Sequence, residues 1–143
     1  MKVSVVGGGN AAVFTASLLK WEGEEKNIEV ELIYDPETPS EIVGQATLLD
    51  PPRMLWNATG FDWYHNQINA TFKSGILYEG WGQVNDKVFH AFPADGMAMH
   101  YCPWEMQKHV LDSGVFKVIE GEIDDINSID SDSSTLLIAH SLV

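Results

Sequence analysis

The sequence predicts an α/β fold, and three observations near its N-terminus support this. Lys2–Val6 is a short apolar run rich in β-branched residues, which is typical of a buried strand. A glycine turn follows it, and residues 11–21 then carry apolar side chains at helical spacing. Residues 28–33 alternate apolar and acidic side chains, as a strand with one exposed face does. This order predicts a βαβ unit with parallel strands.

The turn after the first strand matches a dinucleotide-binding fingerprint. Gly7-Gly8-Gly9-Asn10-Ala11-Ala12 fits G-x-G-x-x-G/A between a strand and a helix. Gly7 allows the sharp turn, Gly9 lets the backbone approach a diphosphate, and Ala12 packs the helix on the strand. The N–H groups and the dipole at the helix start then favour the phosphate charge. We predict a Rossmann-like, dinucleotide-binding domain, the alternative being a glycine turn that binds nothing.

An acidic residue at the end of the second strand of such a unit commonly hydrogen-bonds the adenosine ribose. Here Tyr34 ends the strand and Asp35 follows it. Asp35 is the candidate ribose ligand, although neighbouring strand residues face opposite ways.

The rest of the chain predicts further helices and an attached antiparallel β layer. A short helix begins at Asp50-Pro51-Pro52, with Asp50 as its cap, and ends at Gly60. The other expected elements are a loop over residues 35–47, helices over residues 61–70 and 104–111, strands over residues 73–81, 88–92 and 116–121, a candidate return strand through Ile123 and Ile126, and a last strand at residues 136–138.

Composition restricts the class of partner and compartment. The 143 residues carry 21 acidic side chains against 8 Lys and Arg, a formal charge of −13, so we expect neither nucleic acid nor an anionic membrane as a partner. The single cysteine, Cys102, and the lack of a basic, apolar leader favour the cytoplasm. Because His90, His100, Cys102 and His109 lack tight ligand spacing, we expect no metal. Nothing around Cys102 marks it as a nucleophile.

Three stretches, in this order, carry a resemblance to a known family. They are Val6-Gly7-Gly8-Gly9-Asn10-Ala11, Val43-Gly44-Gln45-Ala46-Thr47, and Phe72-Lys73-Ser74-Gly75-Ile76 ahead of Trp81. Together they resemble the N-terminal part of the flavin-dependent halogenases, the tryptophan halogenase family. We therefore expect residues 1–143 to be an N-terminal, FAD-binding portion of such a protein, truncated before the W-x-W-x-I-P signature and the substrate part.

The resemblance implies a role for each of these stretches. FADH2 from a separate flavin reductase, together with O2 and a halide ion, generates hypohalous acid, which is delivered to Lys73. A lysine is suited to this because it is a point charge on a flexible stem. The alternative for Lys73 is a solvated lysine at a strand end. The remaining implied site residues are Val43, Gly44, Gln45, Ala46 and Thr47 in a strap that touches the flavin, Ile123 near the adenine, and His90 and Phe92 stacking an aromatic, indole-like substrate.

The sequence also departs from the family. Gln45 stands where the family usually has glutamate, and Tyr34 where it usually has an acid. Two other functions stay open beside a halogenase: a flavin monooxygenase, and a non-catalytic FAD-binding half-protein that needs a complementing chain. For His90 and Phe92, ordinary packing stays open beside substrate stacking. We also expect self-association into a homo-oligomer.

Overall fold

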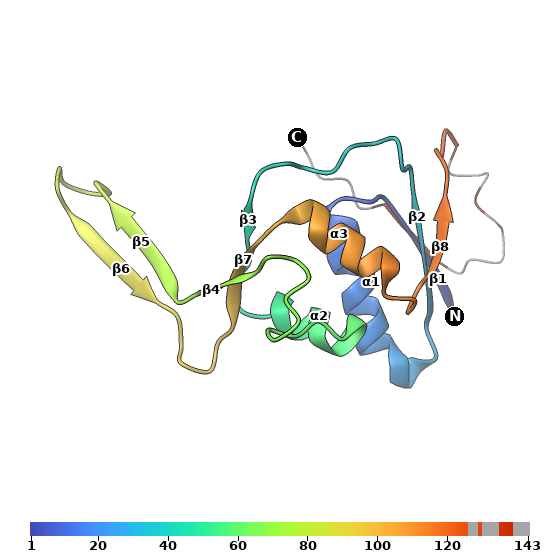
Figure 1. Ribbon diagram of the computed structural model, residues 1–143, viewed down its shortest axis with the longest axis horizontal. Helices are drawn as coiled ribbons and strands as arrows, with labels where there is room; N and C mark the ends of the chain where they lie inside the picture. Colours follow the sequence, from blue (N-terminus) through green and yellow to red (C-terminus); the bar gives the residue numbers. More distant parts are fainter. Residues whose placement is uncertain (126–128, 130–134, 139–143) are drawn as a thin grey trace.

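A four-stranded parallel sheet forms one side of the molecule (Figure 1). The computed structural model describes residues 1–125, 129 and 135–138. The strand order in the sheet is β8-β2-β1-β9, and each neighbouring pair is parallel. In chain order the elements are β1 (Lys2–Val6), α1 (Asn10–Gly23), η1 (Glu24–Lys26), β2 (Glu29–Tyr34), β3 (Gln45–Ala46), α2 (Pro51–Thr59), β4 (Thr71–Lys73), β5 (Gly75–Glu79), β6 (Lys87–Ala91), β7 (Ala98–Tyr101), α3 (Pro103–Asp112), β8 (Lys117–Glu120) and β9 (Thr135–Ile138).

The predicted βαβ unit is confirmed, since β1 and β2 pair in parallel and α1 connects them. Ala12 and Ala16, one turn apart on α1, are fully buried together with Val13. Small side chains at this spacing let the helix lie close to the sheet. The core continues through Leu55 of α2 and Met106 of α3, and the three helices lie together in the middle of the molecule (Figure 1).

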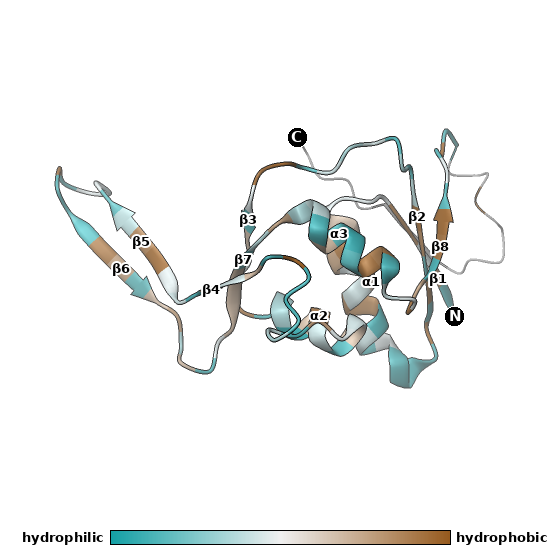
Figure 2. Ribbon diagram, viewed as in Figure 1, coloured by the Kyte–Doolittle hydropathy of each residue, from teal (hydrophilic) through white to brown (hydrophobic). Residues whose placement is uncertain are grey.

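The predicted antiparallel layer consists of two separate sheets. One has the order β3-β7-β4, and the other is the β5–β6 hairpin, which extends away from the helices (Figure 1). Both hairpin strands carry apolar stretches (Figure 2). Leu77 and Phe89 form a cross-strand pair and are 54% and 57% exposed. The hairpin therefore presents apolar side chains on its surface.

The prediction of a helix over residues 61–70 is wrong, because polar side chains capture the backbone there. The Asp62 carboxylate accepts hydrogen bonds from the Tyr64 and His65 N–H groups. The Asn66 amide both donates to the Ala70 carbonyl and accepts from the Ala70 N–H, at 2.6 and 2.7 Å. Such bonds compete with the helical ladder, so the segment forms turns.

The predicted strand over residues 73–81 is divided at Ser74, where the chain passes from one sheet to the other. β4 pairs with β7, whereas β5 pairs with β6. A Cβ at Gly75 would lie 2.5 Å from the His90 carbonyl oxygen, so the close approach at this corner requires glycine. The short strands β3 and β7 were not predicted.

The structure confirms several of the other predicted elements and corrects two details. The helix over residues 51–59 and the strands near residues 88–92, 116–121 and 136–138 are confirmed. Asp50 precedes α2, but its carboxylate pairs with the Arg53 guanidinium at 2.9 Å and makes no cap bond. Ile123 lies outside any strand, and Ile126 lies outside the described residues. No helix within residues 1–125 is long and apolar enough to cross a membrane.

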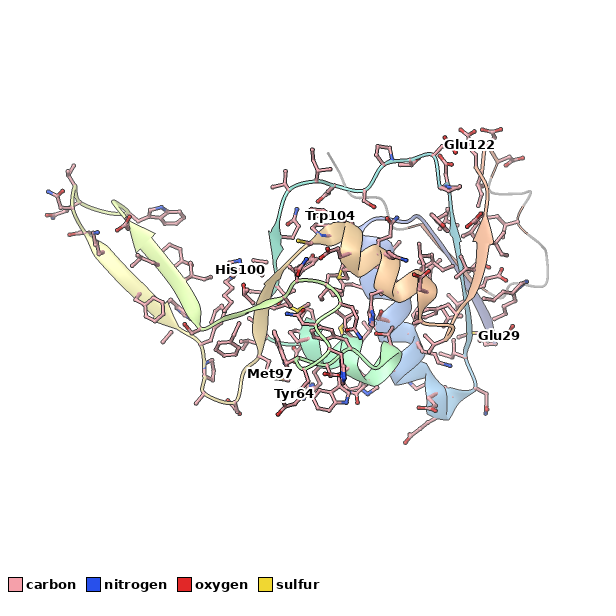
Figure 3. All side chains as sticks on the ribbon, in the orientation of Figure 1. Glu29, Tyr64, Met97, His100, Trp104 and Glu122 are labelled. Carbon is pink, nitrogen blue, oxygen red and sulfur yellow. The ribbon has the colours of Figure 1, made fainter. Side chains whose placement is uncertain are left out.

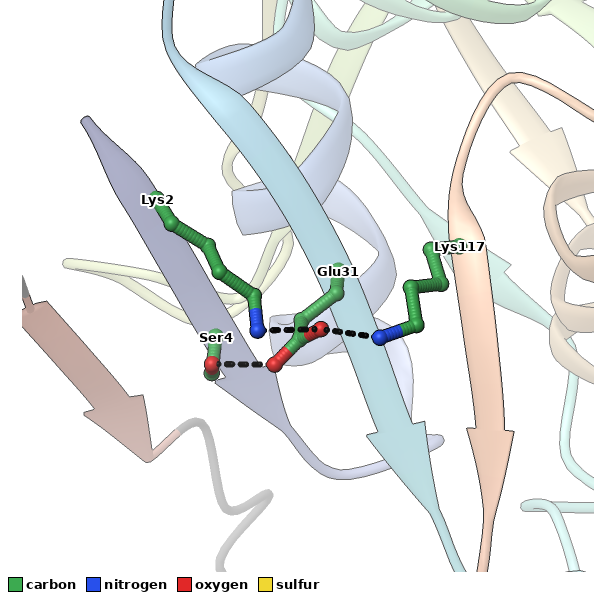
Figure 4. A network of polar contacts seen from close by, with 4 residues as sticks. All are labelled: Lys2, Ser4, Glu31 and Lys117. Atoms are coloured by element: carbon green, nitrogen blue, oxygen red, sulfur yellow. Dashed lines mark hydrogen bonds and ion pairs between the residues drawn. The ribbon is translucent and has the colours of Figure 1, made fainter. Parts of the chain in front are cut away.

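A buried carboxylate connects three strands of the parallel sheet (Figure 4). Glu31 of β2 accepts a hydrogen bond from the Ser4 hydroxyl of β1 at 2.7 Å. The ammonium groups of Lys2 on β1 and Lys117 on β8 lie 3.0 and 3.2 Å from its other oxygen. Burial by itself would raise the Glu31 pKa, but these donors together hold that pKa below its ordinary value. Glu31 is therefore charged at neutral pH.

Candidate functional site

A cavity of about 410 Å³ opens where the carboxyl ends of β1, β2 and β8 meet. Ligands of open α/β sheets bind at this edge, because the loops that leave the strands enclose it. The glycine turn forms one wall of the cavity. Its lining residues are Val6, Gly7, Gly8, Gly9, Ile33, Tyr34, Asp35, Thr38, Pro39, Ser40, Glu41, Gln107, Gly121, Glu122 and Ile123.

The glycine turn has the geometry that a diphosphate requires. Gly7 has φ of 126°, in the region that favours glycine, so the chain can reverse directly after β1. The first α1 hydrogen bond runs from the Val13 N–H to the Gly9 carbonyl, which leaves the earlier N–H groups without helical acceptors. Asn10 Oδ1, also at the helix start, is buried and has no hydrogen-bond partner within the described part of the chain. The free backbone N–H groups fit a bound anion, whereas Asn10 Oδ1 is an acceptor and requires a donor instead.

The loop after β2 forms the second wall. The Asp35 carboxylate accepts hydrogen bonds from the Thr38 hydroxyl at 2.6 Å and the Glu37 N–H at 2.9 Å. These bonds, the Thr38 bond first, lower the Asp35 pKa, so its charge is retained at the cavity edge. Tyr34 donates its hydroxyl to Glu120 at 3.1 Å. Figure 3 shows Glu122 just beyond the end of β8.

The third wall is α3, through Gln107. Gln107 accepts a hydrogen bond from the Ser40 hydroxyl of the opposite wall. Its Nε2 lies 2.5 Å from the position that a Cβ on Gly8 would occupy. A side chain at position 8 would displace this amide, so Gly8 and Gln107 are packed directly against each other.

A second group of predicted residues surrounds Lys73 at the end of β4. The half-buried Lys73 ammonium lies 5.4 Å from the Phe92 ring centroid and donates to the Thr47 carbonyl at 3.4 Å. The His90 and Phe92 ring centroids are 6.3 Å apart, with the planes inclined by 71°. His90 lies in β6 and Phe92 directly follows this strand. Alternate positions of an extended chain point to the same side, so the two rings lie on one face. Lys73 is a cation held beside an aromatic ring.

The segment from Glu41 to Thr47 connects these two groups. Glu41 Oε2 accepts from Gln45 Nε2 at 2.7 Å and from Asn10 Nδ2 at 3.4 Å. Gln45 then enters β3, which pairs with β7. Thr47 is buried, and its hydroxyl accepts from the Met99 N–H at 3.0 Å. One end of this segment therefore contacts the start of α1, and the other end contacts Lys73.

The structure separates the predicted cofactor residues into those that line the cavity and those that do not. Gly7, Gly8, Gly9, Asp35 and Ile123 line it. Ala12 is fully buried in the core, and Val43 is 68% exposed. The predicted residues outside the lining are Asn10, Ala11, Ala12, Val43, Gly44, Gln45, Ala46 and Thr47.

Sequence reasoning missed the lining residues Ser40, Glu41 and Gln107. The loop predicted over residues 35–47 carries the first two, but no local pattern places α3 beside the glycine turn. Within residues 1–125, no three or more His, Cys, Asp or Glu side chains come together as metal ligands would. Burial and the nearby Glu105 raise the Cys102 pKa, which favours the thiol over the nucleophilic thiolate.

Comparisons with known proteins agree on one family. The sequence profile of the tryptophan halogenases matches residues 2–124. Tryptophan 7-halogenase RebH from Lentzea aerocolonigenes is 26% identical over 102 residues, covering 70% of this chain and 19% of RebH. A tryptophan halogenase from Shewanella frigidimarina NCIMB 400 superposes with a TM-score of 0.71 at 16% identity, covering 87% of this chain and 37% of that one.

A flavin-dependent halogenase from Xanthomonas campestris is similar as well, with a TM-score of 0.66 at 20% identity and coverage of 94% of this chain and 37% of that chain. These structures bear out the predicted α/β fold with its parallel sheet. The chain spans less than half of the length of each of these relatives.

Proposed function

The chain belongs to the tryptophan halogenase family, and from this premise we propose that it binds FAD and serves in the halogenation of an electron-rich, indole-like aromatic compound. The glycine turn binds the diphosphate, Asp35 the ribose, and Ile123 lies near the adenine. Bound FADH2 and a halide ion would each supply two electrons to O2, so that one oxygen atom leaves as water and the other forms hypohalous acid with the oxidised halogen. The reduced cofactor comes from a separate flavin reductase.

One observation supports this function above the others: a continuous series of contacts runs from the start of α1 to Lys73. Asn10 contacts Glu41, Glu41 contacts Gln45, and Thr47 at the end of the same segment contacts Lys73. A segment that contacts both places can keep a cofactor and a reactive lysine at a fixed separation. Fixed positioning of reacting groups is a large part of what an active site supplies.

Lys73 is the residue to which we assign delivery of the halogen. Its ammonium is held by the Thr47 carbonyl and the Phe92 ring, so its remaining N–H bonds are directed away from these groups. There it can donate a hydrogen bond to hypohalous acid and polarise it toward an aromatic carbon. His90 and Phe92 would hold that ring, and for this the rings must turn from their present edge-to-face arrangement.

Replacement of Lys73 tests this assignment. The chain is supplied with FAD, a flavin reductase, NADH, bromide or chloride, and indole. We expect Lys73→Ala to abolish the halogenated product while O2 consumption continues with release of hydrogen peroxide. Lys87→Ala, on the exposed hairpin, is the matched control and should retain product formation. Undiminished halogenation by Lys73→Ala would contradict the assignment, and oxygenated indole from both proteins would favour a flavin monooxygenase.

The exposed apolar hairpin supports a second candidate, a flavin-binding half-protein that requires a complementing chain. Leu77, Phe89 and Trp81 are 54%, 57% and 74% exposed, and exposed apolar groups of this kind mark interaction surfaces. Turnover by the isolated chain would exclude this candidate. Binding of FAD without turnover, restored by a second polypeptide, would support it.

A further inference from the structure

Gln107 stands between two cavities of the molecule. It lines the glycine-turn cavity and also a cavity of about 530 Å³ between α3 and the loop after β2. Ser40 lines both cavities too. The hydrogen bond from the Ser40 hydroxyl to Gln107 Oε1 therefore fastens the loop to α3 at the boundary between the two spaces.

The two ends of the Gln107 amide have different surroundings. Oε1 accepts the Ser40 hydrogen bond, whereas Nε2 lies against Gly8. Among the residues that the structure describes, no acceptor takes the Nε2 hydrogens. An amide nitrogen has two hydrogens to donate, and here they lie at the wall where the backbone N–H groups of α1 begin. A ligand with acceptor oxygens would satisfy both sets of donors.

We propose that Gln107 is a binding residue of the dinucleotide site, in which Nε2 donates to a phosphate oxygen while Oε1, through Ser40, holds the loop over the diphosphate. This inference rests on the proposed FAD site and adds a side-chain donor from α3 to it. A neutral amide suits the position, because it adds a directed hydrogen bond without the long-range attraction of a lysine. The contact is to phosphate, so it discriminates between nucleotides and nucleosides.

Titration calorimetry with ADP and with adenosine tests the proposal. Gln107→Met keeps the length and packing of the side chain but removes both hydrogen bonds. Gln107→Glu keeps the acceptor for Ser40 but replaces the donor with a negative charge. Ser40→Ala removes only the attachment of the loop. Gln83→Met, in the exposed loop of the hairpin, is the matched control, and circular dichroism shows that each variant is folded.

We expect Gln107→Met to weaken ADP binding about 10-fold, as the loss of one hydrogen bond to a charged group does. Gln107→Glu should weaken it more, Ser40→Ala less, and Gln83→Met not at all. Adenosine affinity should be the same in all five proteins, including the wild type. Unchanged ADP affinity in both Gln107 variants would overturn the proposal, and so would an equal loss for ADP and adenosine.

Titration with FAD separates this inference from the function on which it rests. If the wild-type chain binds FAD and the Gln107 variants bind it equally well, the role of Gln107 fails alone. If the chain binds ADP in a Gln107-dependent way but does not bind FAD, the flavin function fails and the phosphate contact holds. If it binds neither, both fail.

Discussion

At the scale of single residues, Glu41 is the feature that conflicts most with a diphosphate site. It lines the cavity and lies within 3.4 Å of Asn10, where α1 begins. Its carboxylate, together with burial, raises the pKa of Tyr101 to about 12, with burial the larger cause. A negative group in this position repels an incoming phosphate but stabilises the start of a helix while the site is empty.

We therefore expect Glu41→Gln to bind FAD about three- to tenfold more tightly, because the amide keeps an acceptor for Gln45 and removes the repulsion. Fluorescence quenching of FAD gives the dissociation constant. The gain should shrink as salt is added, since ions screen the charge. Glu37→Gln removes the same charge from the same loop at a residue outside the cavity lining. If both variants lowered the FAD dissociation constant equally, the gain in affinity would come from the change in net charge and not from the position of Glu41.

At the scale of elements, one histidine of α3 forms a hydrogen bond with the last residue of α2. The Thr59 hydroxyl donates to the Leu55 carbonyl at 2.7 Å, so it must accept a hydrogen bond from His109 Nε2, 2.9 Å away. The His109 ring also packs edge-on against Phe61. Burial lowers the His109 pKa below its ordinary value of 6.5, and Asp112 opposes this only in part. The neutral ring is the form that the fold favours.

A depressed histidine pKa means that the unfolded chain binds the proton more readily than the folded one. The contribution of His109 to stability is therefore complete above pH 6.5 and declines as the pH falls below that value. Urea unfolding of the wild type and of His109→Gln from pH 8 to pH 5 measures it. We expect the difference in unfolding free energy between the two proteins to narrow toward the acid end. A difference that does not vary with pH would show that folding leaves the His109 pKa unchanged, which would contradict the lowering by burial.

At the scale of the whole molecule, the Glu31 cluster holds the parallel sheet together. Ser4 and Lys2 come from β1 and Lys117 from β8, so one carboxylate connects the central strands with an outer one. The Glu31 side chain is 2% exposed, and removing one member of a buried ionic group is strongly destabilising.

We expect Glu31→Ala to lower the free energy of unfolding by about 3 kcal/mol at pH 7, because two lysines then face each other across the sheet. The Glu31 pKa is depressed, so its stabilisation is present above the ordinary value of 4.5 and is lost as the pH falls below it. The unfolding free energies of the wild type and of Glu31→Ala should therefore converge as the pH is lowered below 4.5. Glu29→Gln, at an exposed position of the same strand, should be near wild type throughout. A loss in Glu29→Gln as large as that in Glu31→Ala would contradict the specific role of the cluster.

Local patterns in the sequence were sufficient for the elements whose side chains follow a period. The β-branched run of β1, the helical spacing of α1 and the glycine turn between them are properties of neighbouring residues, and the βαβ unit followed from them. The 61–70 segment shows the limit of this reasoning. Its aromatic positions suggested a helix, yet Asp62 and Asn66 form hydrogen bonds with the backbone that a helix would have to break.

By itself, then, the sequence determined the α/β class and the glycine turn, and it singled out Lys73 as the candidate catalytic residue. Tertiary structure alone decided that Gln107 packs against Gly8, that Glu41 connects Asn10 with Gln45, and that Lys73 lies between Thr47 and Phe92. The physical reason is that periodicity records which face of an element is buried, but not which other element buries it. That choice depends on how helices and strands far apart in the chain fill the same core.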